Sequence, residues 1–221
     1  MNKLIIFDLD GTLINSVGGI AQSVNRTRIE LGFKPLEEAV ITTYTGDGAK
    51  KLLERSFADV TLPVPLEEAV QMMIRNYAAD PIYHTGLYDG VSEGLARLKQ
   101  AGWITAVVSN KPQLVAEKII SGLGIADLLN ENIGGGAGFP LKPAPDAMLY
   151  LREKYQADPE CCYIAGDNHT DLNAAKNAGM KSIFCRYGFG IKMDAVSTTE
   201  VDHFSELTNY LIKIGEVRPE T

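Results

Sequence analysis

Residues 4–13 read Leu-Ile-Ile-Phe-Asp-Leu-Asp-Gly-Thr-Leu, an apolar run that ends in two aspartates one residue apart. A short apolar run of this kind is typical of a strand buried in a parallel sheet. Open α/β sheets bind ligands at the carboxyl ends of such strands, which is where Asp8 and Asp10 stand. Two neighbouring carboxylates repel each other there unless a cation or a proton joins them. We therefore interpret the pair as part of a site rather than as turn residues.

The overall composition is that of an ordinary globular protein, with 221 residues, 45% of them hydrophobic and 22% charged. This length allows one large domain, or a core domain with a smaller insert. The chain carries 28 acidic and 21 basic residues, for a net charge of −7. An acidic balance argues against a track for nucleic-acid phosphates, so no nucleic-acid partner is expected.

The three cysteines, Cys161, Cys162 and Cys185, are odd in number and two of them are adjacent. This pattern argues against a disulfide framework and fits a reducing cytosol. No apolar stretch approaches the roughly 18 residues that a membrane span needs. Because the sequence starts directly with a strand, we expect no signal peptide, no membrane partner and a cytoplasmic location.

A predicted strand opens the sequence, and from Tyr88 onward predicted strands and helices alternate. Strands separated by helices of about 10–15 residues indicate βαβ units. Such units build a doubly wound parallel sheet, Rossmann-like, with helices on both faces. The predicted strands are 4–8, 104–109, about 132–134, 162–166 and 181–185, and the predicted helices are 91–100, 112–122, 144–156, 170–178 and 204–214.

The segment between Leu13 and about Pro81 shows no convincing strand and is helical throughout. We therefore expect residues 15–81 to form an inserted α-helical cap domain over the carboxyl ends of the strands. Residues 1–14 and 82–221 would then form the catalytic core. The helices predicted within the insert are 16–31, 36–42, 46–57 and 66–79.

Two further strand ends carry groups suited to an anion. Ser109 and Asn110 end the run that begins at Ile104, where a hydroxyl and free backbone N–H groups can bind phosphate. Taken alone, Ser109 is more simply explained as an N-cap of the next helix. Lys142 is flanked by prolines that stiffen the backbone and can hold its side chain inward. A lone loop lysine, however, usually faces solvent.

The fourth polar strand end is Gly166-Asp-Asn-His-Thr-Asp171, with two aspartates four residues apart. Asp171 alone is most simply a carboxylate favoured by a helix N-terminus. What is specific is the joint order along the chain: Asp-x-Asp, Ser, Lys, then Asp-x₃-Asp at the ends of successive strands.

This order resembles the haloacid-dehalogenase-like phosphohydrolases over essentially the whole chain. Asp8-Leu-Asp10-Gly-Thr is similar to their first motif, Ser109 to their second, Lys142 to their third and Gly166-Asp167-x₃-Asp171 to their fourth. The helical insert between the first two motifs resembles the small α-helical cap of that family. One departure is Asn168, where Ser or Thr more often stands.

The resemblance implies a Mg²⁺-dependent phosphomonoester hydrolase that forms an aspartyl-phosphate. It assigns Asp8 as the nucleophile and Asp10 as the acid and base. Asp8, the Asp10 carbonyl and Asp167 would bind the metal, while Asp171 would hold metal-bound water or orient the motif lysine. The groups implied to bind the phosphoryl oxygens, directly or by close backbone approach, are Gly11, Thr12, Ser109, the Asn110 amide and Lys142.

Several phrases resemble the phosphoglycolate phosphatases within this family. They are Thr45-Gly-Asp-Gly-Ala49, Ser109-Asn-Lys-Pro112, Ile133-Gly-Gly135 and Tyr187-Gly-Phe-Gly190. The expected substrate is therefore small and phosphorylated, most specifically 2-phosphoglycolate. Substrate choice is assigned to the cap loop of Thr45, Gly46, Asp47 and Gly48, although that loop also reads as an ordinary glycine-containing helix entry.

Other readings remain open at this level. The same chemistry could serve a nucleotide, a sugar phosphate, pyrophosphate or a β-phosphoglucomutase reaction. A metal-independent dehalogenase would not need the second aspartate of the first motif, and a non-catalytic binding module would not need every charged position. The oligomeric state is expected to be a monomer or a homodimer.

Overall fold

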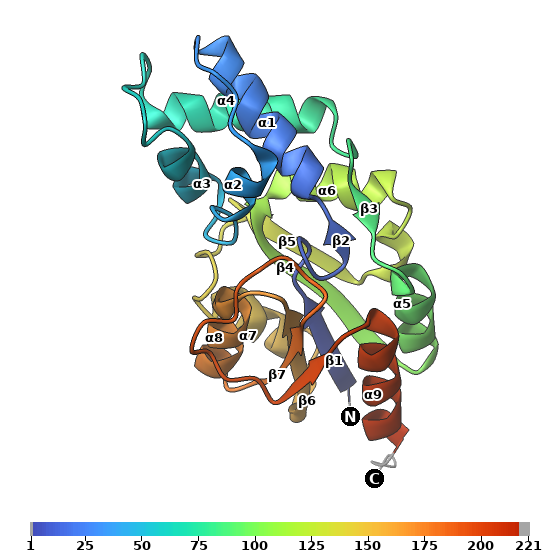
Figure 1. Cartoon of the computed structure of the whole chain (residues 1–221). Helices are drawn as coiled ribbons and strands as arrows, with labels where there is room; N and C mark the ends of the chain where they lie inside the picture. Colours follow the sequence, from blue (N-terminus) through green and yellow to red (C-terminus); the bar gives the residue numbers. More distant parts are fainter. Residues whose placement is uncertain (1, 217–221) are drawn as a thin grey trace.

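A six-stranded parallel sheet forms the centre of the protein, in the order β5-β4-β1-β6-β7-β8 (Figure 1). The structure is a computed structural model and describes residues 2–216. The first strand lies between β4 and β6, so Asp8 follows a strand at the middle of the sheet. The strands are β1 (Asn2–Phe7), β4 (Trp103–Pro112), β5 (Glu131–Gly135), β6 (Ala157–Gly166), β7 (Lys181–Cys185) and β8 (Thr199–Val201).

Helices cover both faces of this sheet because alternate residues of β1 point to opposite sides. Ile5 and Phe7 belong to one buried cluster, which includes residues of α5, α6 and α9. Leu4 and Ile6 belong to a second cluster with residues of α7 and α8. The expected doubly wound α/β fold is confirmed. The helices of the core are α5 (Val91–Gln100), α6 (Gln113–Gly122), η1 (Ala126–Leu128), α7 (Asp146–Lys154), α8 (His169–Ala178) and α9 (Phe204–Glu216).

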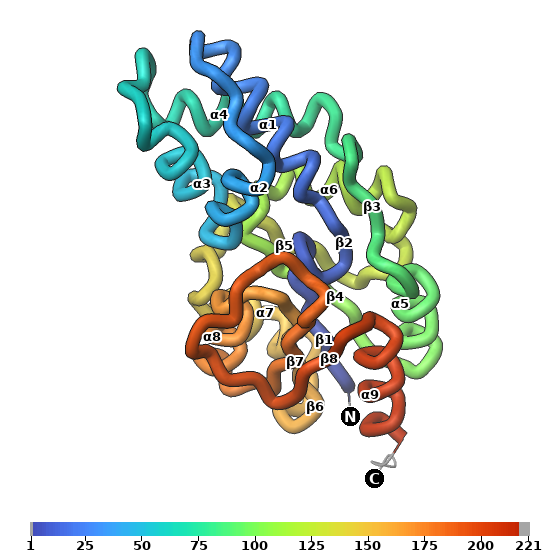
Figure 2. The backbone as a smooth tube through the Cα atoms, in the orientation of Figure 1, coloured from blue at the N-terminus to red at the C-terminus, as the bar shows by residue number. Residues whose placement is uncertain are grey.

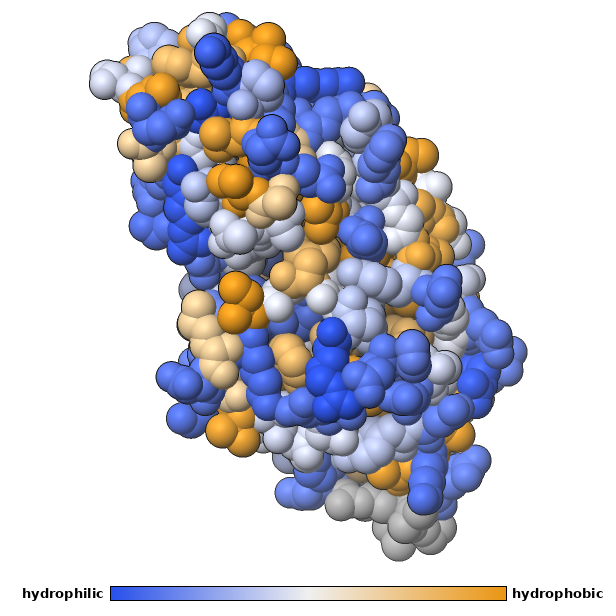
Figure 3. Space-filling view, viewed as in Figure 1, coloured by the Kyte–Doolittle hydropathy of each residue, from blue (hydrophilic) through white to orange (hydrophobic). Residues whose placement is uncertain are grey.

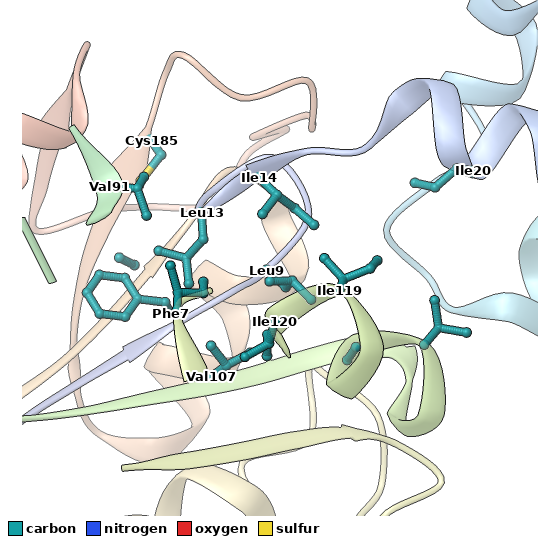
Figure 4. Close-up of a cluster of buried hydrophobic side chains, with 14 of the residues drawn as sticks. Phe7, Leu9, Leu13, Ile14, Ile20, Val91, Val107, Ile119, Ile120 and Cys185 are labelled. Carbon is teal, nitrogen blue, oxygen red and sulfur yellow. The ribbon is translucent and has the colours of Figure 1, made fainter. Parts of the chain in front are cut away.

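Four helices stand apart from the sheet, beyond one end of it (Figures 1 and 2). They are α1 (Val17–Glu30), α2 (Glu38–Thr42), α3 (Ala49–Ser56) and α4 (Leu66–Ala79), and they pack on one another. The apolar core continues from Phe7 through Leu13 and Ile14 to Ile20 at the base of α1 (Figure 4). We keep the division into a core and a cap at residues 15–81 as a proposal, which this arrangement supports.

A short antiparallel ladder connects the two parts of the chain. It pairs β2 (Ile14–Asn15) with β3 (Gly86–Leu87). The expectation that no strand lies between Leu13 and Pro81 is therefore wrong at its first residues. Two-residue strands show no periodicity, and β8, which was also not predicted, has the polar sequence Thr-Glu-Val.

The lengths of the two motif-bearing strands were underestimated. The strand β4 runs to Pro112 rather than ending at residue 109, and its register against β5 shifts between Val108 and Pro112. The strand β6 begins at Ala157, and its pairing with β1 also contains a register shift. Irregular pairing of this kind bends a strand and redirects its side chains. In β4 the shift falls on the polar residues at the end of the strand.

The face shown in Figure 3 is mainly hydrophilic, with hydrophobic residues scattered over it. Within residues 2–216, no helix combines the length and the apolar character that crossing a bilayer requires.

Phe7→Ala should lower the free energy of unfolding by about 3–5 kcal/mol, because it opens a cavity in the centre of the larger cluster. Phe7 is fully buried, with its ring centroid 5.7 Å from that of Phe204. Ile29→Ala is the control, since Ile29 is 60% exposed and its loss should change stability by less than about 0.5 kcal/mol. Urea unfolding measures both, and equal losses would contradict the assignment of β1 to the packed centre.

Candidate active site

The polar strand ends identified in the sequence meet at one cavity of about 70 Å³. The strand ends supply its floor, and residues from the helical segment supply its opposite wall. The floor is lined by Asp8, Asp10, Ser109, Asn110, Lys111, Lys142, Asp167 and Asn168, and the wall by Ile20, Thr45, Gly46, Gly48, Ala49, Leu52, Met73 and Tyr77.

Lys142 lies between two carboxylates on this floor. Its Nζ is 2.7 Å from Asp8 Oδ1 and 2.7 Å from Asp171 Oδ1, and the lysine side chain is 3% exposed. Carboxylate oxygens of Asp8, Asp167 and Asp171 lie within 4.8 Å of one another. Lys142 is therefore buried in the site and does not face solvent, and it neutralises one of at least three negative charges.

The pKa values of these groups reflect an excess of negative charge in the cluster. Burial, reinforced by the charges of Asp171 and Asp10 and opposed by Lys142, raises the pKa of Asp8 to about 6. Burial and the neighbouring carboxylates raise the pKa of Asp167 well above its ordinary value. Burial alone would lower the pKa of Lys142, but Asp171 and Asp8 outweigh it and raise that pKa. Ionising Asp8 and Asp167 together is unfavourable here unless another cation is present.

The donor set fits a divalent cation that prefers oxygen ligands, such as Mg²⁺. Carboxylate oxygens of Asp8 and Asp167 lie within 4.8 Å of each other, Asp8 beside Lys142 and Asp167 beside the N–H of Gly190. Their high pKa values show that the fold holds them close at an electrostatic cost, which a bound cation would offset.

Asp171 has both of its oxygens engaged. Oδ1 faces Lys142, and Oδ2 accepts a hydrogen bond of 3.0 Å from the backbone N–H of Asn168. Asn168 in turn caps α8, accepting from the N–H of Thr170 at 3.2 Å. This reciprocal cap fixes the start of the helix and the carboxylate together. It supports the expectation that Asp171 orients Lys142.

Asp167 is enclosed by glycines. The N–H of Gly190 donates to Asp167 Oδ2 at 2.6 Å. A Cβ on Gly188 would lie 2.3 Å from the Asp167 Cβ, and one on Gly11 would lie 1.8 Å from Oδ2. Gly11 also has φ +79°, a backbone conformation that favours glycine. The phrase Tyr187-Gly-Phe-Gly190 is thus a backbone cradle for this carboxylate.

Asn110 links the end of β4 to the loop at Gly46 in the helical insert. Its side chain accepts from the N–H of Lys142 at 2.8 Å and donates to the carbonyl of Gly46 at 3.0 Å. The helix α6 begins with Pro112 at its N-cap position, so Ser109 is not an N-cap residue. Ser109 Oγ instead accepts from the N–H of Lys111 at 3.2 Å and lines the cavity.

Asp10 is bound on one oxygen by two donors. Lys111 Nζ lies 2.8 Å from Asp10 Oδ1, and the Ser16 hydroxyl donates to the same oxygen. Lys111 also donates to the hydroxyl of Tyr77, on α4, at 2.8 Å. The second aspartate of the first motif therefore has a lysine partner of its own, separate from Lys142.

Comparison with known proteins adds to this geometry. A family described as haloacid dehalogenase-like hydrolase matches residues 5–185. The chain belongs to this hydrolase family. It is 34% identical over 198 residues to the phosphoglycolate phosphatase of Colwellia psychrerythraea, covering 87% of this chain and 88% of that one. It is 34% identical over 218 residues to that of Vibrio vulnificus, covering 96% and 95%.

A crystal structure described as a predicted phosphoglycolate phosphatase from Haemophilus somnus superposes on this hydrolase with a TM-score of 0.88. The two share 30% sequence identity over 95% of this chain and 97% of that one. The hydrolase is therefore a phosphatase, similar to phosphoglycolate phosphatases.

The structure places some of the expected site residues elsewhere in the hydrolase. Thr45, Gly46 and Gly48 line the cavity, but the carboxylate of Asp47 pairs with Arg55 at 2.6 Å and is not part of the lining. Gly11 and Thr12 also lie outside the lining. Gly11 packs against Asp167, and Thr12 is fully buried. The tight turn after β1 uses their N–H groups, which donate to Ile14 and Leu9.

Lys111 and Tyr77, two polar residues that line the cavity, were not singled out from the sequence. Lys111 directly follows Asn110, so its position next to the second motif is a signal in the sequence that could have identified it. Tyr77 has no such signal, because its contact with Lys111 joins residues 34 positions apart.

Gly188→Ala should lower kcat/KM of the hydrolase by about 10²-fold, because the added methyl displaces Asp167 and misplacement of a site group by ~1 Å has effects of this size. Gly86→Ala is the matched control, since a Cβ there meets nothing within 4 Å. Hydrolysis of a generic phosphomonoester and thermal unfolding would be measured for both variants. Equal activity in the two folded variants would show that the cradle does not position Asp167.

Proposed function

We propose that the protein is a Mg²⁺-dependent phosphomonoester hydrolase that acts through an aspartyl-phosphate on Asp8, with 2-phosphoglycolate as its substrate. The observation that carries this proposal is the convergence of Asp8, Asp10, Asp167 and Lys142 on one small cavity at the carboxyl ends of the strands. Phosphoryl transfer needs charge neutralisation and positioning, and these residue types supply both.

In the first step, a carboxylate oxygen of Asp8 attacks phosphorus, and the bond from phosphorus to the leaving oxygen breaks. Asp10 gives its proton to that oxygen. In the second step, Asp10 takes a proton from water, which attacks phosphorus and releases phosphate from Asp8. Lys142, Ser109 and the Asn110 amide stabilise the phosphoryl oxygens as their charge shifts.

Asp8, the Asp10 carbonyl and Asp167 would hold Mg²⁺ in this proposal, with Asp171 acting on metal-bound water or on Lys142. The bound ion would supply the positive charge that lets an anionic carboxylate approach an anionic phosphate. Residues of the chain then do the rest: Lys142 holds Asp8 in place at 2.7 Å, and Asp171 holds Lys142.

The choice of a small substrate rests on the size of the cavity and on the relatives. A space of about 70 Å³ is well below the roughly 300–1,000 Å³ of sites for drug-sized ligands. Relatives covering nearly the whole chain are named phosphoglycolate phosphatases. We propose that the Thr45–Gly48 loop closes over the substrate, held by the bond from Asn110 to Gly46.

The cellular setting stays part of the proposal. Cys162 and Cys185 are free thiols, which is compatible with the expected cytoplasm. A monomer or a homodimer remains the expected assembly.

Hydrolysis of a panel of small phosphoesters, nucleotides and pyrophosphate, with and without Mg²⁺, tests the function. We expect 2-phosphoglycolate to give the highest kcat/KM, and chelation to abolish turnover. Asp8→Asn should lower kcat by on the order of 10⁴-fold or more, as expected for loss of a nucleophile. Asp127→Asn, at an exposed position outside the cavity, is the control. A nucleotide or pyrophosphate preference would refute the substrate assignment, and full activity of Asp8→Asn would refute the mechanism.

Mg²⁺ should raise the melting temperature more at about pH 7.5 than at about pH 5. The pKa of Asp8 is raised from 3.8 to about 6, so the ionised carboxyl opposes folding of the cation-free protein. The stability given by its proton is present at low pH and is lost as the pH rises through 6. A cation replaces that proton, and saturation at about 100 times Kd contributes about 2.7 kcal/mol. This corresponds to a shift of roughly 5–10 °C for a chain of this size.

Asp167→Asn should remove most of this shift, because it replaces a carboxylate ligand with a neutral amide and removes one negative charge. Differential scanning fluorimetry with and without Mg²⁺ measures it without reference to activity. A shift that is equal at both pH values and unchanged in Asp167→Asn would place the cation elsewhere.

A further inference from the structure

Two cations line the cavity among the described residues, and only one of them is explained by phosphoryl transfer. Lys142 is held by Asp8 and Asp171. The other is Lys111, which none of the proposed chemical steps uses.

The basic residues of the cap are engaged elsewhere. Arg55 pairs with Asp47 at 2.6 Å, and Lys50 pairs with Glu67 at 2.9 Å on an exposed surface. Neither lines the cavity. The cap therefore closes the site with apolar side chains and a loop, and within the described residues it presents no cation to a bound substrate.

Lys111 is held rigidly at the boundary between core and cap. Its Nζ lies 2.8 Å from Asp10 Oδ1, 2.8 Å from the hydroxyl of Tyr77 and 4.2 Å from the centroid of the Tyr77 ring. The residue is 6% exposed. An ammonium group carries three N–H donors, and these two partners account for two of them. A third donor is available to a ligand in the cavity.

The surroundings of Lys111 favour an anion over a neutral group. Ile20, Leu52 and Met73 form apolar parts of the same wall. In such a weakly polar environment, a charge-assisted hydrogen bond to an ammonium group is stronger than in water. A carboxylate placed there would pair with Lys111, since Lys142 is engaged at the phosphoryl position.

We propose that Lys111 determines substrate specificity by binding the anionic group at the far end of the phosphoester, the carboxylate of 2-phosphoglycolate. The inference rests on the proposed function and assigns to a core residue the charge recognition that the sequence assigned to the cap. Ser109 contacts the phosphoryl group, and two residues later Lys111 binds the carboxylate, so one strand end spans both ends of a two-carbon substrate. Tyr77 holds the lysine in place from the cap.

The test compares two substrates that differ in this group, 2-phosphoglycolate and ethyl phosphate, in the wild type and in Lys111→Met. The ratio of kcat/KM between the two substrates should fall by roughly 10- to 100-fold in the variant, the range expected for one hydrogen bond to a charged group. Taking a ratio cancels any general damage to the chemical step. Tyr77→Phe, which removes only the hydroxyl, should lower the same ratio to a smaller extent.

Lys118→Met is the matched control. Lys118 also joins the core to the cap, through a bond of 2.8 Å from its Nζ to the Ala78 carbonyl, but it lies outside the cavity. Its ratio should equal that of the wild type. Binding of both substrates to Asp8→Asn and to Asp8→Asn/Lys111→Met, measured by calorimetry, gives the same comparison without turnover.

Equal losses for both substrates in Lys111→Met would overturn the inference and leave Lys111 as a residue that only positions Asp10. A wild-type ratio near one would overturn it as well. If another phosphorylated acid proves to be the best substrate, the assignment of 2-phosphoglycolate fails. The inference about Lys111 is then still judged by the change in ratio between the wild type and the variant.

Discussion

The mutual repulsion of Asp8, Asp167 and Asp171 is the constraint to which the rest of the site is adapted. Their oxygens lie within 4.8 Å of one another in a largely buried place, and Lys142 pairs with two of the three carboxylates. Charges so close in a weakly polar interior would separate if their backbones could move. They are held because Asp8 follows the central strand, Asp171 is locked into a helix cap, and glycine backbone encloses Asp167.

The parallel sheet explains why residues so distant in sequence share this constraint. Asp8 and Asp167 directly follow β1 and β6, and Ser109 lies near the end of β4. These three strands are neighbours whose carboxyl ends point the same way. Rigid strands buried on both faces fix the positions of the groups that follow them. The packed clusters on the two faces of the sheet fix these strands, and they act together with the contacts within the site to hold the carboxylates in place.

This logic also sets what the sequence can predict. Asp8, Ser109, Lys142 and Asp167 could be placed together from the sequence, because strand ends in a parallel sheet converge whatever the details of packing. The contact of Tyr77 with the core could not, since no local pattern encodes how a helix of the insert meets the sheet. The two-residue strands β2 and β3 were too short to show a period, and the glycine cradle is visible only through its distances to Asp167.

The ends of the substrate are read by different parts of one strand end, and this links recognition to chemistry. Lys111 contacts Asp10, the proposed acid and base, and Tyr77 of the cap at equal distances of 2.8 Å. A substrate anion that binds the third donor of Lys111 therefore shares this ammonium group with Asp10 and changes the charge next to the acid. The cap contributes by holding Lys111 in place and by excluding water. The position of the cap and the ability of Asp10 to transfer a proton therefore depend on each other.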